Sequence, residues 1–191
     1  KAEFYYLSFF EERGQFKILP EDLFVGNKRQ DFFRDITTLI KSFKNKLEIE
    51  GYLKDLDKKE AKKRAVELTY AYIIQFILYK TLVDNNFGNF EHEFQEKTKA
   101  IHQCLEVKQY GKVLAIIEGI SNEISQNIYR PFKKEQEFIN QTVFELIRKP
   151  ENKLSDVSPW LDIFVFIKKY NFANIQNEIF GYIYENYLKE L

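Results

Sequence analysis

Residues 66–83 read VELTYAYIIQFILYKTLV, and apolar side chains cover nearly every face of the helix that this segment would form. A helix of this kind has to be surrounded by other helices. Its most apolar part, residues 68–79, has 12 residues between Glu67 and Lys80, whereas a membrane-spanning helix needs about 20. We therefore predict that residues 66–83 form the buried centre of a helical fold, and we predict no contact with a membrane.

Apolar residues recur at spacings of three and four on both sides of this segment. This period predicts helices over residues 31–47, 54–83, 94–105, 113–128, 135–148 and 174–191, with Asp31 capping the first of them. The short apolar run 160–170 is also assigned to a helix, residues 85–89 to a turn and residues 152–159 to a loop. The predicted fold is all-α, an irregular helical bundle of about six to eight helices, with many of its 19 Phe and 12 Tyr in the core.

The N-terminal residues have a different pattern. Residues 4–10 are an aromatic run, Gly14 interrupts it, and residues 15–19 follow before Pro20. Two short runs separated by a glycine are typical of a short β-hairpin. We therefore divide the chain into a short aromatic N-terminal element at 1–30, a hairpin or the tail of a preceding domain, and a helical domain at 31–191.

The sequence contains no pattern that points firmly to catalysis or cofactor binding. Asp55 with residues 60–62, and residues 106–108, match the letters of a metal-dependent nuclease, but both lie in predicted helices whereas nucleases of that kind use strands. Its seven glycines are never closer than eight residues, so no glycine loop can cradle a phosphate or cofactor. His92, His102 and Cys104 are the only imidazole or thiol groups, and His102 and Cys104 lie on different faces of a helix. We predict no catalytic, cofactor or metal site in this chain, and the single cysteine predicts a reduced, cytoplasmic setting.

Residues 171–188 read NFANIQNEIFGYIYENYL, the most specific string in the chain. It resembles the helix directly upstream of the catalytic domain in adenine-N6 DNA methyltransferases of type II restriction-modification systems, both type IIG and type I-like single-chain enzymes. A weaker likeness to the family's buried helix covers residues 69–85. The residues at matching places of the string are Ile179, Gly181, Ile183, Tyr184, Glu185, Tyr187 and Leu188.

This resemblance implies a parent protein that methylates adenine with S-adenosylmethionine, and it leaves open whether the parent also cleaves DNA. The family's methyl-donor loop and its Asn/Asp-Pro-Pro-aromatic motif are absent here, because prolines occur only at positions 20, 131, 150 and 159. The absence of Met and the helical pattern that runs to Leu191 also predict a segment of a longer polypeptide. The chain would be a non-catalytic helical linker that positions the adjoining methyltransferase domain. The alternative is a free-standing helical protein-interaction domain unrelated to DNA.

One local cluster could contact DNA although Lys plus Arg equals Asp plus Glu at 29 each. Five cations lie within seven residues, and such groups supply sequence-independent affinity for phosphates: Lys58, Lys59, Lys62, Lys63 and Arg64. Asp55, Asp57 and Glu60 are interleaved with them, and pairs four residues apart would neutralise part of the charge. A solvated charged face is therefore the alternative interpretation.

Overall fold

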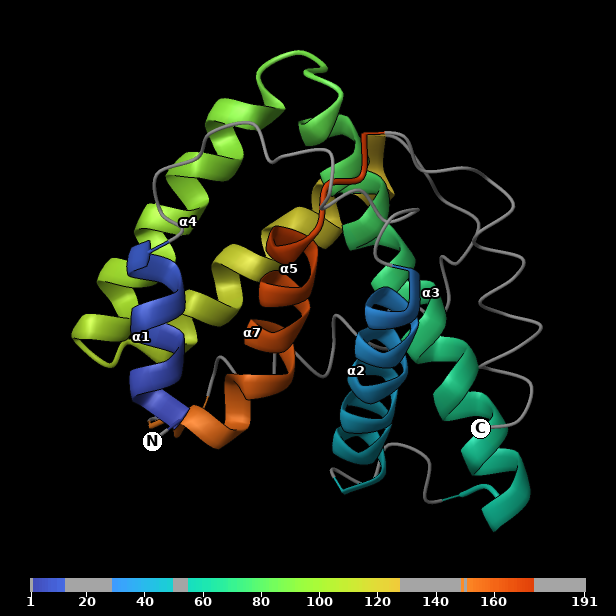
Figure 1. Cartoon of the computed structure of the whole chain (residues 1–191). Coiled ribbons are helices and arrows are strands. Elements are labelled where there is room, and N and C mark those ends of the chain that lie inside the picture. Colours follow the sequence, from blue (N-terminus) through green and yellow to red (C-terminus); the bar gives the residue numbers. More distant parts are fainter. Residues whose placement is uncertain (1, 13–28, 50–54, 128–148, 150, 174–191) are drawn as a thin grey trace.

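The computed structural model describes residues 2–12, 29–49, 55–127, 149 and 151–173. These residues form six helices and contain no strand (Figure 1), which confirms the predicted all-α helical bundle: α1 (Ala2–Glu12), α2 (Arg29–Ile49), α3 (Lys58–Asp84), α4 (Phe90–Glu106), α5 (Tyr110–Asn127) and α7 (Leu154–Lys169). No helix in these ranges is long and apolar enough to cross a membrane.

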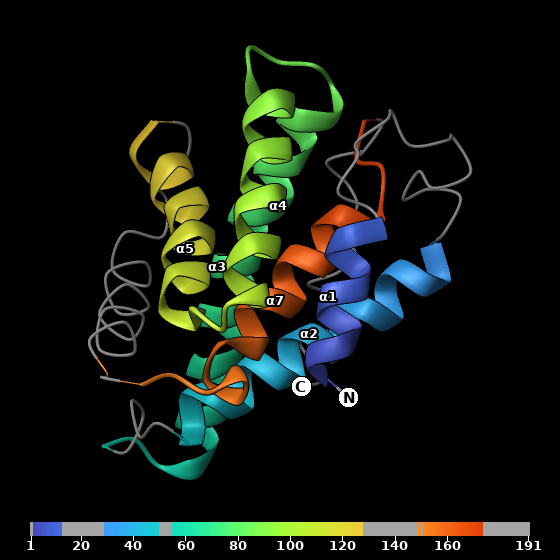
Figure 2. The same cartoon turned by 90° about the vertical axis from the view of Figure 1, so that its left-hand side faces the viewer.

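Helices α3 and α7 lie at the centre of the bundle. Helix α3 contacts α2, α4, α5 and α7, and α7 contacts α1, α2, α3 and α5 (Figures 1 and 2). Ile73, Ile74 and Ile77 of α3 are 1%, 6% and 0% exposed. The prediction that residues 66–83 form a buried central helix is therefore confirmed.

The two ends of α3 are defined by local hydrogen bonds. The Asp57 carboxylate accepts the N–H of Glu60 at 2.8 Å and caps the start of the helix. Beyond Asp84 the chain turns at residues 85–89, where Asn86 and Gly88 have positive φ angles of 57° and 52°. Asparagine and glycine tolerate this backbone conformation best, so the predicted turn is confirmed.

Aromatic rings join the helices into one core. Phe164 of α7 packs against Phe10 of α1 and Phe94 of α4, with ring centroids 5.5 and 5.0 Å apart. Phe32 of α2 packs against Phe166 of α7 at 5.4 Å and against Phe172 at 6.1 Å. Aromatic contacts at these distances add to the free energy of apolar burial.

The predicted N-terminal hairpin is wrong in its first half, because residues 4–10 lie in helix α1. Tyr6 and Phe10, four residues apart, are both buried on one face of this helix, while Phe4 and Tyr5 face solvent. Packing against α4 and α7 selects the helix over the strand that the aromatic content favoured. Residues 15–19, the second half of the hairpin, lie outside the described residues.

The predicted loop at 152–159 is wrong from residue 154 onward, because α7 begins there and runs to Lys169. The Asp156 carboxylate accepts the N–H of Lys153 at 2.9 Å and stabilises this start. Pro159 has no N–H to donate to the Ser155 carbonyl, and the Ser158 hydroxyl donates to that carbonyl instead, at 3.4 Å. The helix predicted over residues 160–170 is confirmed.

Three further predictions concern the cap at Asp31 and the helices over residues 135–148 and 174–191. Helix α2 begins at Arg29, so Asp31 lies in its first turn and does not cap it. Asp31 is paired with Arg34 at 2.9 Å. The helices predicted over 135–148 and 174–191 lie outside the described residues.

Candidate functional site

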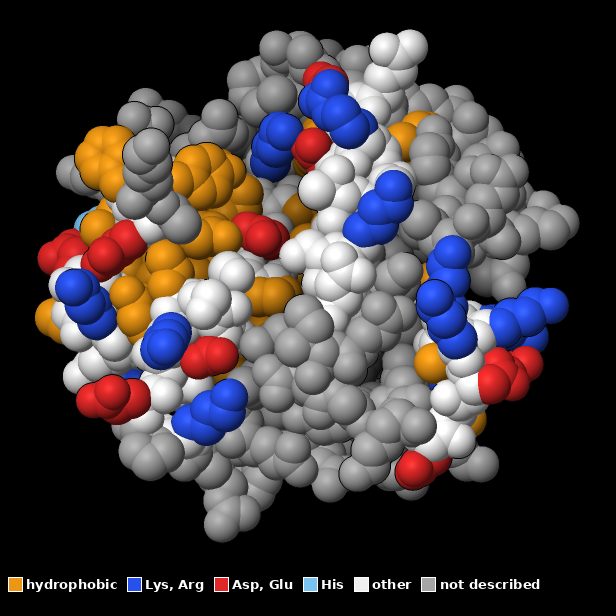
Figure 3. All heavy atoms as spheres, turned by 90° about the horizontal axis from the view of Figure 1, so that it is seen from below, with side chains coloured by type: hydrophobic (Ala, Val, Ile, Leu, Met, Phe, Trp, Pro, Cys, Tyr) orange, Lys and Arg blue, Asp and Glu red, His pale blue; other side chains and the backbone are white. Residues whose placement is uncertain are grey.

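The predicted basic cluster occupies the first two turns of α3. Lys58, Lys59, Lys62 and Lys63 are exposed and Arg64 is half-buried. Val66 is the first residue described as buried in this helix. The start of α3 therefore projects from the bundle (Figure 1), and its cations gather at the right-hand edge of the face in Figure 3.

The electrostatics of this end of α3 are mixed. Asp55, Asp57 and Glu60 are exposed beside the cations, and the Arg64 guanidinium lies 3.6 Å from the Glu67 carboxylate. The lysines, however, lie at the positive end of the helix dipole, which disfavours cations and favours a bound anion. The structure thus places the predicted cations together on an accessible surface. The acids Asp55, Asp57 and Glu60 lie on the same surface and offset part of the positive charge.

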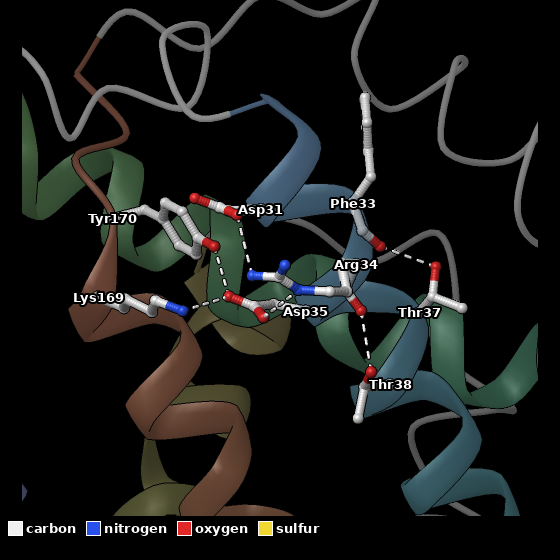
Figure 4. Close-up of polar contacts among 8 residues, drawn as sticks. All are labelled: Asp31, Phe33, Arg34, Asp35, Thr37, Thr38, Lys169 and Tyr170. Atoms are coloured by element: carbon white, nitrogen blue, oxygen red, sulfur yellow. Dashed lines mark hydrogen bonds and ion pairs between the residues drawn. The ribbon is translucent and has the colours of Figure 1, made fainter.

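A second polar cluster joins α2 to the end of α7 (Figure 4). The Asp35 carboxylate accepts a hydrogen bond from the Lys169 ammonium at 2.6 Å and another from the Tyr170 hydroxyl. Burial, together with the nearby Asp35, raises the pKa of Tyr170, so its hydroxyl stays protonated and donates. Arg34 lies 3.9 Å from Asp35 and completes the cluster.

This cluster lies at the edge of a hollow of about 360 Å³ between α1, α2 and α7. The polar side chains that line the hollow are Tyr5, Arg34, Asp35, Thr38, Ser42, Asp162 and Lys169. The Tyr6 hydroxyl donates to Asp162 at 2.5 Å, and burial raises the pKa of Asp162 while this bond opposes the rise. Donors from other parts of the fold hold both carboxylates, so the cluster cross-links helices and does not resemble an acid–base pair.

A buried ion pair connects the end of α3 to the residues after α7. The Lys80 ammonium, which is 0% exposed, donates to Asp84 at 2.7 Å and to the Tyr170 carbonyl at 3.0 Å. Asp84 also accepts the N–H of Phe172 at 2.8 Å. The ammonium lies 5.6 and 5.8 Å from the ring centroids of Phe94 and Phe172. Burial lowers the pKa of Lys80 and the neighbouring Asp84 opposes this effect.

Side-chain hydrogen bonds join α3, α5 and α7 in the core. The Tyr72 hydroxyl donates to Glu118 and accepts the indole N–H of Trp160 at 3.0 Å. One helical turn further on, the Ser121 hydroxyl donates to Gln75 at 2.6 Å. The first bond joins residues 72 and 118 and the second joins residues 75 and 121. The residue number rises by three on both helices, so α3 and α5 run in the same direction where they meet.

The remaining predicted residues lie elsewhere. His102 and Glu106 pair at 2.9 Å on α4, and Cys104 is half-buried against the core. The described residues include no group of three His, Cys, Asp or Glu side chains that could hold a metal ion. The family-motif residues 179–188 lie outside the described residues.

Sequence reasoning missed the buried polar residues. Lys80 interrupts an apolar segment, and Glu118 lies within the stripe of α5, so each was visible as an exception to its pattern. Asp84 lies four residues from Lys80, a spacing that brings two side chains together on a helix. The other partners, Tyr170 of Lys80 and Tyr72 of Glu118, are 90 and 46 residues away in sequence, and helical spacing says nothing about them.

Comparison of the chain with known proteins finds no matching family model, no matching curated protein and no matching solved structure.

Proposed function

We propose that this chain is a non-catalytic helical coupling domain of a restriction-modification enzyme with adenine-specific DNA methyltransferase activity. In this proposal it positions the adjoining methyltransferase domain in the cytoplasm and contacts the DNA backbone through the start of α3. The observation that carries the DNA contact is the exposure of Lys58, Lys59, Lys62 and Lys63 on a projecting helix end. S-adenosylmethionine would bind the parent protein's catalytic domain and not this chain.

The coupling role is supported by the contacts of the residues that directly follow α7. Lys80 and Asp84 hold Tyr170 and Phe172 through backbone hydrogen bonds. The string that resembles the lead-in to the methyltransferase domain begins at residue 171, so its first residues are attached to the helical core. These contacts fix the first residues of the string relative to the bundle, as a coupling role requires.

The DNA contact is tested by duplex binding over a series of salt concentrations, with the full-length protein that contains this chain. A cation that neutralises a phosphate releases condensed counterions, which makes the affinity depend on salt. Replacing the five cations of the cluster with Gln should therefore reduce the slope of log affinity against log salt. The expected reduction is about 0.9 for each phosphate contact that is lost. The reduction in affinity should be similar for unrelated DNA sequences, since phosphate contacts carry no base information.

A matched control removes five positive charges elsewhere. Lys41, Lys99, Lys108, Lys112 and Lys153 are all exposed, and their replacement with Gln changes the net charge by the same amount. We expect the control to keep the wild-type slope. Equal slopes for the wild type and the α3 variant would contradict the DNA contact and would show that the cluster is a solvated face of the helix.

The alternative function, a protein-interaction domain unrelated to DNA, is favoured by the aromatic surface of α1. Phe4 and Tyr5 are 75% and 53% exposed, and Tyr5 also lines the hollow between α1, α2 and α7. Exposed aromatic side chains are enriched at protein interfaces. A double variant with Phe4→Ser and Tyr5→Ser would lose binding to a protein partner while its duplex affinity stays that of the wild type.

A further inference from the structure

Glu118 joins three helices through a short chain of hydrogen bonds. It lies in α5, is 6% exposed, and one of its carboxyl oxygens, Oε2, accepts a hydrogen bond from Tyr72 of α3. The oxygen of Tyr72 accepts in turn from the indole of Trp160 in α7 at 3.0 Å. A change at the Glu118 carboxyl therefore reaches α3 and α7 directly.

The second carboxyl oxygen of Glu118 has no partner in the described part of the chain. Its Oε1 atom is buried and makes no hydrogen bond to any of the described residues. A neutral carboxyl group tolerates this situation far better than a carboxylate, whose spread charge requires donors at both oxygens. Among the described residues the site thus suits the neutral form and provides one donor, Tyr72, for the charged form.

Neighbouring elements do not supply a compensating cation in the described part of the chain. From α3 the carboxyl is faced by Tyr72, with the neutral Gln75 one turn further on, and from α7 by Trp160. The charged Glu93 and Lys97 of α4 act on Glu123, five residues along α5. Burial consequently raises the pKa of Glu118 to about 7, and the hydrogen bond from Tyr72 limits the rise.

We propose that Glu118, Tyr72 and Trp160 form a proton-linked joint between α3, α5 and α7, tight when the Glu118 carboxyl is neutral and loosened when it is charged. Above neutral pH the carboxyl releases its proton to solvent, no other covalent bond changes, and an incompletely hydrated carboxylate remains between the helices. Its tendency to reach water favours displacement of α5 from α3 and α7. The proposal concerns the described core and does not depend on the proposed DNA contact.

Trp160 is the only tryptophan in the chain, so its fluorescence reports on this joint. We expect the emission of the folded protein to change between about pH 5.5 and pH 8.5 as Glu118 loses its proton. Glu118→Gln should abolish the change, because an amide does not ionise in this range. Tyr72→Phe should move the midpoint to higher pH, because the variant lacks the hydrogen bond that favours the carboxylate.

The matched control is Glu123→Gln, which removes an acid from the same helix and should keep the wild-type transition. A transition that persists in Glu118→Gln would overturn the proposal. Constant emission of the wild type over this range would overturn it as well.

Amide hydrogen exchange provides an independent measurement. After correction for intrinsic rates, α5 of the wild type should exchange faster above pH 8 than α5 of Glu118→Gln, and at acid pH the two should agree. Identical exchange of α5 in both proteins at high pH would also contradict the joint.

Discussion

Lys80 and Glu118 are both ionisable side chains in the core, yet their surroundings differ. Lys80 has the carboxylate of Asp84, the carbonyl of Tyr170 and two aromatic rings around its ammonium group. Among the described residues, Glu118 has one donor, Tyr72, and no partner for its second carboxyl oxygen. A buried charge is tolerated when partners replace its water, so Lys80 can remain charged inside the fold whereas ionisation of Glu118 opposes folding.

This difference predicts an unusual effect of pH on stability. A group whose pKa is higher in the folded state than in the unfolded state stabilises the fold fully below the unfolded pKa, and loses this effect as pH rises through the folded pKa. For Glu118 the pKa rises from an ordinary 4.5 to about 7 on folding, so the charged form costs about 3 kcal/mol above pH 8. Glu118→Gln should therefore be more stable than the wild type by up to about 3 kcal/mol at pH 8.5, and the gain should decline as pH falls to about 4.5.

Urea denaturation of both proteins between these pH values measures the difference, and subtracting the two curves cancels the contributions of the other acids. A difference that stays constant with pH would show that Glu118 does not titrate between the two pKa values. A loss of stability at every pH would show that the Tyr72 hydroxyl needs a carboxylate and not an amide.

The properties of single buried polar residues could be predicted only in part from the sequence. The sequence places Lys80 at the end of an apolar stretch and Glu118 among the apolar residues of 113–128, but neither burial nor contact with Tyr170 or Tyr72 was predicted for them. These contacts depend on the way distant helices pack. The basic cluster of α3 was predictable because its residues are adjacent in sequence and their exposure requires no partner.

Among helices, the longest apolar pattern gave the most accurate predictions. Residues 66–83 form most of α3, and the stripes at 94–105 and 113–128 correspond to α4 and α5, because burial on one face leaves a period that is visible in the sequence. The errors lie at α1 and at the start of α7. In α1 the aromatic content suggested strands. At α7 Pro159 suggested a loop, because a proline inside a helix removes a hydrogen bond, but the Ser158 hydroxyl donates to the Ser155 carbonyl that Pro159 cannot reach.

The attachment of α3 to the residues after α7 depends on the Lys80–Asp84 pair. In Lys80→Met the Asp84 carboxylate, 12% exposed, keeps one donor among the described residues, the Phe172 N–H. Removing one member of a largely buried pair costs about 3 to 5 kcal/mol. Asp84→Asn should also destabilise the fold, and the double variant should lose less than the sum of the two, because the charges interact directly.

Denaturation of the three variants provides this double-mutant cycle. Lys99→Met is the control, because Lys99 is exposed and its pair with Glu96 at 3.5 Å lies on the surface, where such pairs contribute at most about 1 kcal/mol. Strictly additive effects of the two core substitutions would indicate that the pair contributes only packing.

At the scale of the whole molecule, the six described helices share one hydrophobic core. Buried residues of all six belong to the same cluster, from Phe10 in α1 to Ile167 in α7. The division of the chain at residue 30 was based on a change of pattern in the sequence. Sequence patterns locate elements, whereas the extent of a domain depends on which elements pack together, and α1 packs with α4 and α7.

This shared core predicts that α1 unfolds together with the rest of the bundle. Phe10 is 1% exposed and its ring packs against Phe164, four residues beyond Trp160 in α7. Phe10→Ala should lower the free energy of unfolding by about 3 to 5 kcal/mol, and urea transitions followed by Trp160 fluorescence and by far-ultraviolet circular dichroism should shift together. Phe4→Ala, at a 75% exposed position of the same helix, should change stability by less than about 0.5 kcal/mol. If residues 1–30 instead belonged to a preceding domain, Phe10→Ala would leave the Trp160 transition in place, and α1 would have to be assigned to a separate folding unit.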